Sequence, residues 1–333
     1  MRFLELAKDF QDGKLHKWVY WKLVREKMKP LTEMQEVLAW NDDVARIEIR
    51  KDGIVLVHSG GADEREDGIR FYMDFEETIS RAEAEFSMKG DYEQEDFDFL
   101  RRFLPENAVV LDVGGNVGIF SLSLAQEKKN LQIFAFEPLP STYAKMQANF
   151  RLNPRLAEKV KSYNKGLSKE VGEAVFYLPG ASEAASLRPN EDAYYSIEST
   201  ATGEYTGQQK MQEVRCELDT VDHFCETNAI VSVHVLKCDV EGAEYDVLRG
   251  ARKTLIESRP IVYSEMLRKH AKRFGYHPNE IISYMKELDY CCTTFRGQKL
   301  IEIIQMTDAT EERNFFFLHK ENHADILRQH LET

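Results

Sequence analysis

The sequence lacks a long apolar run. No stretch approaches the roughly 18–20 apolar residues that a membrane-spanning helix requires, and charged residues recur throughout. The first residues, Met1 to Asp9, are interrupted by charge too often for the apolar segment of a secretory signal. We therefore expect a cytoplasmic protein with no membrane span.

Cysteine is also scarce. The five cysteines are odd in number, and none forms the CxxC spacing typical of a zinc site. A disulfide framework and a structural zinc centre are thus not expected. We interpret the cysteines as reduced thiols, which fits a cytoplasmic protein.

Basic residues are outnumbered. The chain has 44 Lys and Arg against 57 Asp and Glu, a formal net charge of −13, and no Lys/Arg-rich block. Binding nucleic acid needs a basic surface that displaces counterions from phosphates. We therefore expect no nucleic-acid partner.

From residue 108 onward, short apolar stretches alternate with amphipathic ones. This pattern is typical of a doubly wound, mostly parallel α/β sheet covered by helices on both faces. Strands are expected at 109–113, 131–136, 160–164, 233–238 and 261–265, with a late antiparallel strand at 314–318. Helices are expected at 93–103, 119–126, 140–152, 243–257 and 278–288. We assign this main domain to residues 91–333.

Residues 1–90 differ in pattern and are expected to form an N-terminal extension. The first forty residues look helical up to Pro30, a hairpin is expected over 45–57, and another helix over 76–85. Within the main domain, strands at 174–178 and 213–218 flank a polar insertion of about 180–210. Because long irregular segments in compact domains are usually functional or disordered, we expect a substrate-covering loop there, with plain disorder as the alternative.

The first candidate motif runs from Asp112 to Gly118 and reads DVGGNVG. It lies where a buried strand turns into a helix, so glycines allow a sharp turn and the free N–H groups of the helix suit an anion. The dinucleotide fingerprint G-x-G-x-x-G is not met, because its third glycine falls on Ile119, and the Lys-Ser/Thr pair of a phosphate loop is absent. A ligand with a carboxylate and an ammonium fits better, with Asp112 receiving the ammonium. A tight turn without a ligand is the alternative.

The second motif is an acid at the end of the next strand. Glu137 follows Phe134-Ala135-Phe136, where doubly wound folds place an acid that accepts hydrogen bonds from ribose hydroxyls. An amino-acid end together with a ribose points to S-adenosylmethionine. A surface glutamate at a strand end is the alternative.

The third motif reads KCDVEGAE and spans Lys237 to Glu244. Asp239 ends the fourth strand and is expected in the same crevice as Asp112 and Glu137. It is our first candidate for a general base, and His270, after the fifth strand, is the second. Glu241 either caps the following helix or joins the catalytic group, Glu244 is expected to be a first-turn helix charge, and Lys237 to balance nearby carboxylates.

Together these motifs resemble the FkbM family of methyltransferases, over roughly residues 90 to 265. Gly115 stands where that family usually has alanine. The resemblance implies a class I, Rossmann-like methyltransferase fold and S-adenosylmethionine as methyl donor. It also implies that nine residues bind the donor. The residues concerned are Glu93, Asp112, Gly114, Asn116, Gly118, Glu137, Pro138, Asn164 and Asp239, with Asp112 to Gly118 at the methionine end, Glu137 at the ribose, Asn164 near the adenine and Asp239 close to the methyl.

We therefore expect methyl transfer from S-adenosylmethionine to a hydroxyl of a sugar, glycoconjugate or natural-product-like small molecule, with Asp239, Glu241 and His270 as catalytic residues. An N-methyltransferase and a non-catalytic S-adenosylmethionine-binding scaffold remain alternatives. A nicotinamide-dependent oxidoreductase is disfavoured by the glycine spacing. A divalent metal held by Asp239 and Glu241 is a further alternative, but we do not expect one and assign no metal ligand.

Overall fold

The structure is a computed structural model. It describes residues 3–26, 29, 44–51, 53–58, 68–73, 94–127, 130–178, 212–296 and 299–332. The chain divides into two compact units, one comprising Met1–Ile69 and Arg81–Tyr92, the other Arg70–Ser80 and Glu93–Thr333.

The first unit contains helices and a hairpin. Helix α1 (Phe3–Gln11) is followed by a helical stretch at 17–26, and strands β1 (Val44–Arg50) and β2 (Gly53–His58) pair antiparallel. The predicted hairpin is confirmed. The described part of the region expected to be helical up to Pro30 consists of two helical stretches separated by a turn at 12–16, where Gly13 adopts a positive φ of 71°. The helix expected at 76–85 lies outside the described residues.

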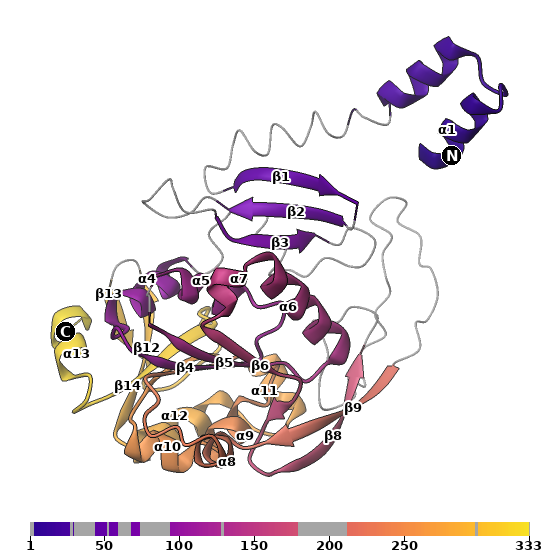
Figure 1. The fold of residues 1–333 in the computed structure, drawn as a ribbon. Helices are drawn as coiled ribbons and strands as arrows, with labels where there is room; N and C mark the ends of the chain where they lie inside the picture. Colours follow the sequence, from indigo (N-terminus) through magenta and orange to yellow (C-terminus); the bar gives the residue numbers. More distant parts are fainter. Residues whose placement is uncertain are drawn as a thin grey trace. The chain divides into compact units, whose positions relative to one another are not determined.

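An eight-stranded sheet forms the centre of the second unit (Figure 1). Five strands are parallel: β6 (Val160–Tyr163), β5 (Gln132–Phe136), β4 (Val109–Val113), β10 (Val235–Cys238) and β11 (Ile261–Glu265), in that spatial order. The sheet continues with antiparallel β14 (Asn314–His319), β12 (Tyr290–Arg296) and β13 (Lys299–Glu302). The parallel strands are short apolar runs because both faces of such a sheet are covered.

Helices cover the two faces of this sheet. Figure 1 shows α4 (Gln94–Phe103), α5 (Ile119–Glu127), α6 (Pro140–Leu152) and α7 (Pro154–Ala157) on one face, and α8 (Val221–Thr227), α9 (Glu244–Arg249), α10 (Arg252–Glu257) and α12 (Pro278–Glu287) on the other. Helix α11 (Arg268–Arg273) follows β11, and α13 (Ala324–His330) lies near the end of the chain. The doubly wound, mostly parallel fold predicted from the sequence is confirmed.

One helix differs from the prediction. The expected helix at 243–257 is broken into α9 and α10 at Gly250 and Ala251. A Cβ on Gly250 would lie 2.1 Å from the Ser168 carbonyl oxygen, so only glycine allows this close approach of two backbones. Glycine at the end of α9 therefore allows the backbone at Ser168 to pack against it.

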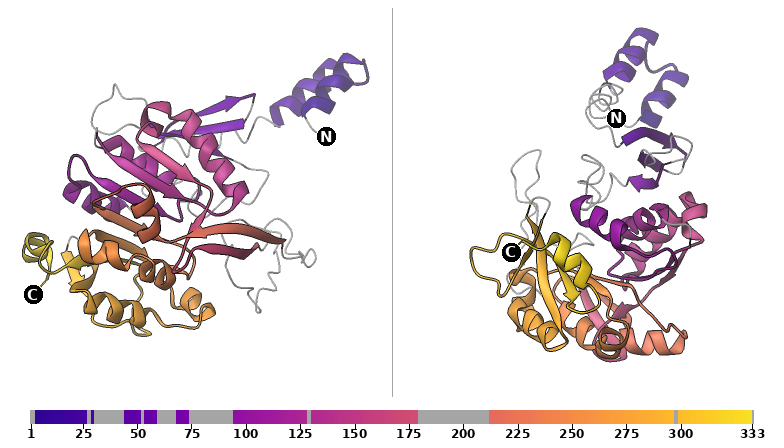
Figure 2. Two further views of the ribbon diagram at one scale, coloured as in Figure 1. Left: turned by 60° about the horizontal axis from the view of Figure 1, so that its bottom comes forward. Right: turned by 90° about the vertical axis from the view of Figure 1, so that its left-hand side faces the viewer.

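A smaller sheet of β7 (Gly166–Leu167), β9 (Gln212–Asp219) and β8 (Gly172–Leu178) belongs to the same unit. The strands β8 and β9 correspond to the two strands predicted on either side of the insertion. They pair antiparallel and project as a long hairpin in Figure 2. The expected loop at 180–210 lies outside the described residues. Strand β3 (Arg70–Met73) is held by Asn153 and Asn149, whose side-chain oxygens accept the amides of Arg70 and Tyr72 at 2.8 and 2.9 Å.

The strand order reverses between β4 and β10. From β4 the chain proceeds outward to β5 and β6, and from β10 it proceeds the other way to β11. In open α/β sheets ligands bind at the carboxyl ends of the strands at such a switch point. Among the described helices none is long and apolar enough to cross a bilayer.

Candidate active site

The loop after β4 is built on glycines. The amides of Gly114 and Gly115 donate to the Phe136 carbonyl at 3.0 and 2.8 Å, which ties this loop to the end of β5. Gly114 has φ +80°, and a Cβ there would lie 1.8 Å from the Asp239 carbonyl oxygen. Gly118 has φ +90°, and a Cβ there would lie 2.7 Å from the Phe150 ring. Both positions therefore require glycine.

Lys237 joins the end of β4 and its glycine loop to the loop after β10. Its buried ammonium is 3.3 Å from Asp112 Oδ1 and 3.6 Å from Asp239 Oδ2, and it donates to the Gly114 carbonyl at 2.5 Å. Buried charge is tolerated only when it is paired in this way. The expectation that Lys237 balances nearby carboxylates is confirmed.

Asp112 is completely buried. Besides its ion pair with Lys237, its Oδ2 accepts a 2.6 Å hydrogen bond from the Ser121 hydroxyl at the start of α5. The carboxylate therefore fixes the turn between β4 and α5 and contributes negative charge beneath the glycine loop.

Glu137 joins the loops that follow β4 and β5. Its Oε2 accepts the Asn116 amide at 3.1 Å and its Oε1 the Leu139 amide at 2.9 Å. Burial raises the pKa of Glu137 to about 7, although both backbone hydrogen bonds and Lys237 favour the ionised form. Asn164 completes this corner, since its Nδ2 donates to the carbonyls of Glu137 and Pro138 at 2.9 and 3.0 Å.

The turn after β10 presents Asp239. The Asp239 amide donates to the Val113 carbonyl at 3.1 Å, while its side chain stays one-third exposed (33%). The turn then passes through two positive φ angles, 56° at Glu241 and 110° at Gly242.

The Glu244 carboxylate accepts hydrogen bonds from the backbone of this turn. Its buried Oε1 accepts the amides of Val240 and Gly242, both at 3.0 Å, and the Tyr276 hydroxyl lies 3.2 Å from its Oε2. Burial raises the pKa of Glu244 to about 7. The interpretation of Glu241 as a helix cap is wrong, because α9 has no side-chain cap. Glu244, expected only as a helix charge, organises the turn.

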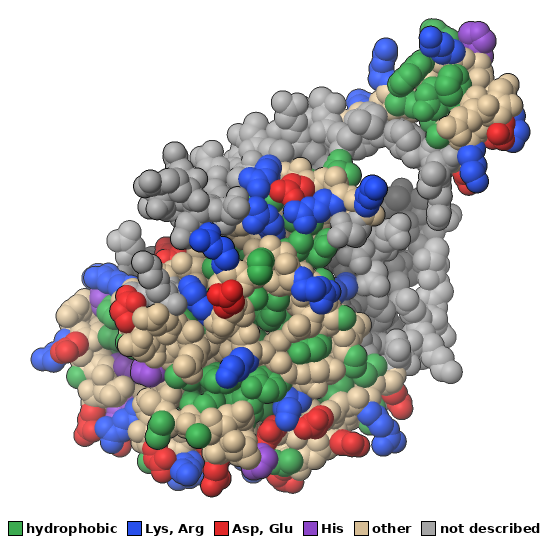
Figure 3. All heavy atoms as spheres, viewed as in Figure 1, with side chains coloured by type: hydrophobic (Ala, Val, Ile, Leu, Met, Phe, Trp, Pro, Cys, Tyr) green, Lys and Arg blue, Asp and Glu red, His purple; other side chains and the backbone are tan. Residues whose placement is uncertain are grey.

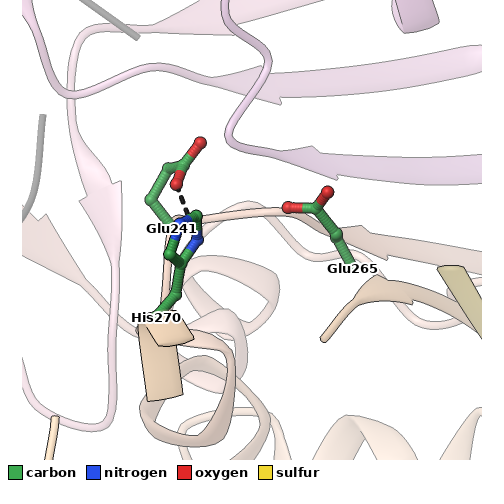
Figure 4. Close-up of side chains that lie close together, drawn as sticks. All are labelled: Glu241, Glu265 and His270. Carbon is green, nitrogen blue, oxygen red and sulfur yellow. Dashed lines mark ion pairs between the residues drawn. The ribbon is translucent and has the colours of Figure 1, made fainter. Parts of the chain in front are cut away.

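Glu241 turns instead toward the loop after β11. Its Oε2 lies 2.8 Å from His270 Nδ1, and Figure 4 shows the Glu265 carboxylate pointing toward this pair. Ligand atoms of Glu241, Glu265 and His270 all lie within 4.8 Å of one another. The sequence reasoning missed Glu265, although it is a charged residue at the carboxyl end of an apolar strand, the signal that identified Asp112.

The predicted residues thus fall into two groups. One group surrounds Lys237 and the glycine loop at the switch point: Asp112, Gly114, Asn116, Gly118, Glu137, Pro138, Asn164 and Asp239. The other group joins Glu241 and His270, so the alternative metal pair of Asp239 and Glu241 is not the cluster that forms. Glu93 lies outside the described residues.

Comparison with known proteins gives consistent matches. The sequence profile described as "Methyltransferase FkbM domain" matches residues 112–292. The methyltransferase sdnD of Sordaria araneosa is 31% identical over 185 residues, which cover 52% of this chain and 70% of that protein. The AMB antimetabolite synthetase AmbE of Pseudomonas aeruginosa is 33% identical over 52% of this chain, but the match spans only 9% of that protein. The 2-O-methyltransferase NoeI of Sinorhizobium fredii is 25% identical over 47% of this chain and 62% of its own length.

Among solved structures, the methyltransferase FkbM of Methylobacillus flagellatus aligns with a TM-score of 0.39 and 14% identity, over 67% of this chain and 47% of that chain. The fold assignment therefore depends on the strand order of this chain itself. The family profile covers more than half of the sequence and includes the glycine loop, Glu137 and the Lys237–Glu244 turn. This chain belongs to the FkbM methyltransferase family.

Proposed function

We propose that the protein transfers a methyl group from S-adenosylmethionine to a hydroxyl of a sugar or natural-product-like small molecule. The observation that carries this proposal is that the loops after β5 and β10 both meet the glycine loop after β4 at the switch point, with Lys237 paired to Asp112 and Asp239 there. Family membership supports methyl transfer. The name of the relative NoeI, a 2-O-methyltransferase, supports a hydroxyl acceptor.

The residues present fit such a donor. Gly114 and Gly118 let the glycine loop pack closely against the Asp239 carbonyl and the Phe150 ring, and we propose that this tightly turned loop is the cradle for the donor. The free N–H groups at the start of α5 favour a carboxylate there. Each Glu137 oxygen accepts one backbone N–H and keeps a second lone pair for a ribose hydroxyl. Asp112 would contribute charge toward the ammonium, and Pro138 and Asn164 would flank the adenine.

S-adenosylmethionine supplies a methyl group already activated on a sulfonium, so alignment of the acceptor provides much of the catalysis. We propose Asp239 as the general base, because it is accessible and lies beside the glycine loop. It would accept the proton of the acceptor hydroxyl. Glu241 and His270 would act on the acceptor from the neighbouring loops.

Calorimetric titration with S-adenosylmethionine, with NAD as control, tests the donor. Micromolar binding of the donor and none of NAD is the expected result. Donor binding without any transfer to sugars or small-molecule alcohols would favour the scaffold alternative, and binding of NAD alone would overturn the proposal.

The variant Asp239→Asn tests the base. It should keep donor affinity and lower turnover by about 10²–10⁴-fold, the usual contribution of a general base. Steady-state assays by mass spectrometry of the methylated product measure this. A loss below about threefold would favour a nitrogen acceptor, which needs no strong base.

We also propose that the protein is cytoplasmic. All five cysteines are buried free thiols, which supports a reducing compartment.

A further inference from the structure

We infer that Glu241, Glu265 and His270 form a divalent-metal site that holds the methyl acceptor through two neighbouring oxygens, so the preferred acceptor is a vicinal diol. This inference deepens the proposed function and rests on it for the identity of the reaction. Metal binding itself does not depend on the donor and can be measured separately.

The geometry of the three side chains suits a single ion. Their ligand atoms lie within 4.8 Å of one another, and Glu241 Oε2 and His270 Nδ1 are 2.8 Å apart. Around an octahedral ion with ligands at about 2.1 Å, adjacent ligands are about 3 Å apart and opposite ones about 4.2 Å. Small rotations of side chains that are all partly exposed would bring the three atoms onto such a shell.

The three ligand types narrow the choice of metal ion. Two carboxylates favour hard cations such as Mg²⁺ and Mn²⁺, and an imidazole shifts the preference from Mg²⁺ toward Mn²⁺ or another transition metal. Three protein ligands leave other coordination positions for water or substrate oxygens. The side chains of Glu241 and His270 are 34% and 18% exposed, so the site is accessible to such a substrate.

The position of the cluster in the fold points to the acceptor. Glu241 lies two residues after Asp239 in the turn that follows β10, and Glu265 ends the neighbouring parallel strand β11. Helix α11 packs closely on the same turn, since a Cβ on Gly242 would lie 2.8 Å from the His270 carbonyl oxygen. The three ligands therefore come from adjacent carboxyl-end loops on the β11 side of the switch point, whereas Glu137 follows β5 on the other side.

In this arrangement the metal ligands and the general base are different residues. With His270 holding the metal, its imidazole would not be available as a base, so the Asp239 carboxylate would take the proton of the acceptor hydroxyl. The hydroxyl oxygen forms the new C–O bond while the C–S bond breaks, and sulfur keeps the bonding pair as a neutral thioether. Asp239 then releases its proton to water, so charge and atoms balance.

Titration of the full chain with Mn²⁺, followed by electron paramagnetic resonance of free Mn²⁺ and by calorimetry, tests the site. One Mn²⁺ per chain is expected for the wild type. Glu265→Gln and His270→Asn should each weaken Mn²⁺ binding by more than tenfold. Asp246→Asn removes one carboxylate of similar exposure (26%) from nearby α9 and should leave binding within twofold.

Circular dichroism and S-adenosylmethionine titration on the same samples separate the outcomes. Variants that bind Mn²⁺ more weakly but keep native folding and donor affinity would support the inference. A turnover that is higher on vicinal diols than on isolated alcohols, and a loss of this preference when EDTA is added, would support it too. No Mn²⁺ binding by the wild type, or equal binding by wild type and Glu265→Gln, would leave only a Glu241–His270 ion pair and overturn it. Failure of the donor to bind would instead count against the proposed function.

Discussion

Glu137 is the residue whose protonation should control donor binding. Its buried carboxyl has a pKa of about 7, so below pH 7 it is mostly protonated in the free protein. Accepting two ribose hydroxyls favours the ionised form. The dissociation constant for S-adenosylmethionine should therefore rise as pH falls below about 7, approaching tenfold per pH unit. Calorimetry from pH 5.5 to 8 measures this.

The variant Glu137→Gln is the control for this pH dependence. It should bind the donor more weakly at pH 8 and show a nearly flat affinity across the range. An affinity of the wild type that does not change with pH would contradict the role of Glu137.

Gly114 offers a test of the cradle with a matched partner. Gly114→Ala would place a Cβ 1.8 Å from the Asp239 carbonyl oxygen, whereas at Gly275, with a similar φ of +78°, a Cβ meets nothing within 4 Å. Gly275→Ala should thus cost only the backbone strain, about 1–2 kcal/mol, and keep donor affinity. Gly114→Ala should lower the free energy of unfolding further and abolish donor binding, as urea unfolding and calorimetry would measure. Equal effects of the two substitutions would refute the cradle.

The sequence predicted part of this site. Charged residues that end apolar strands, such as Asp112 and Asp239, could be recognised because such strands are otherwise buried. The role of Lys237 in balancing the nearby carboxylates was also predicted. The contacts of Glu244 could not be predicted, because a side chain in a first helical turn is ambiguous until its neighbours are placed. Glu265 also ends an apolar strand and could have been recognised by the same signal, but its place beside Glu241 and His270 became clear only once the strands and α11 were placed.

At the scale of elements, the turn from Asp239 to Gly242 depends on Glu244. Glu244→Gln would replace an acceptor of two amide hydrogen bonds with a weaker one, so the free energy of unfolding should fall by about 1–3 kcal/mol. Because Asp239 belongs to this turn, turnover should fall at least tenfold, while donor affinity changes less than threefold. Denaturant unfolding and steady-state assays measure both.

Glu257→Gln removes a charge from the exposed end of α10 and provides the control. It should leave stability and turnover nearly unchanged. A Glu244→Gln protein that retains full turnover would show that the turn keeps its shape without this carboxylate.

Sequence periodicity predicted the parallel strands and most of their helices, because continuous apolar runs and amphipathic stretches reflect burial directly. The break between α9 and α10 was not predicted, and the need for glycine beside it could not be, since a Cβ on Gly250 would meet Ser168 from another part of the chain. The short strands β3 and β13 were also missed. Four residues give too little alternation to be recognised without their partner strands.

At the scale of the whole molecule, the strand order places every proposed donor-binding and catalytic residue from Asp112 to His270 in the second unit. The first unit presents apolar side chains on its helices, with Trp18 and Trp21 exposed by 69% and 53% (Figure 3). Exposed aromatic side chains of this kind are typical of contact surfaces. We propose that residues 1–90 are an extension that makes contacts and that residues 91–333 form the catalytic domain.

Deletion of residues 1–43 tests that proposal. The shortened chain retains the β1–β2 hairpin and every residue named at the donor site, so it should bind S-adenosylmethionine within about twofold of the full chain, because the groups that set this affinity are unchanged. Calorimetry on both proteins, with circular dichroism as a check on folding, measures the outcome. A folded protein with lost donor affinity would mean that the N-terminal helices complete the donor site. Unchanged donor affinity with reduced turnover would instead assign those helices to the acceptor, because only acceptor binding would then depend on them.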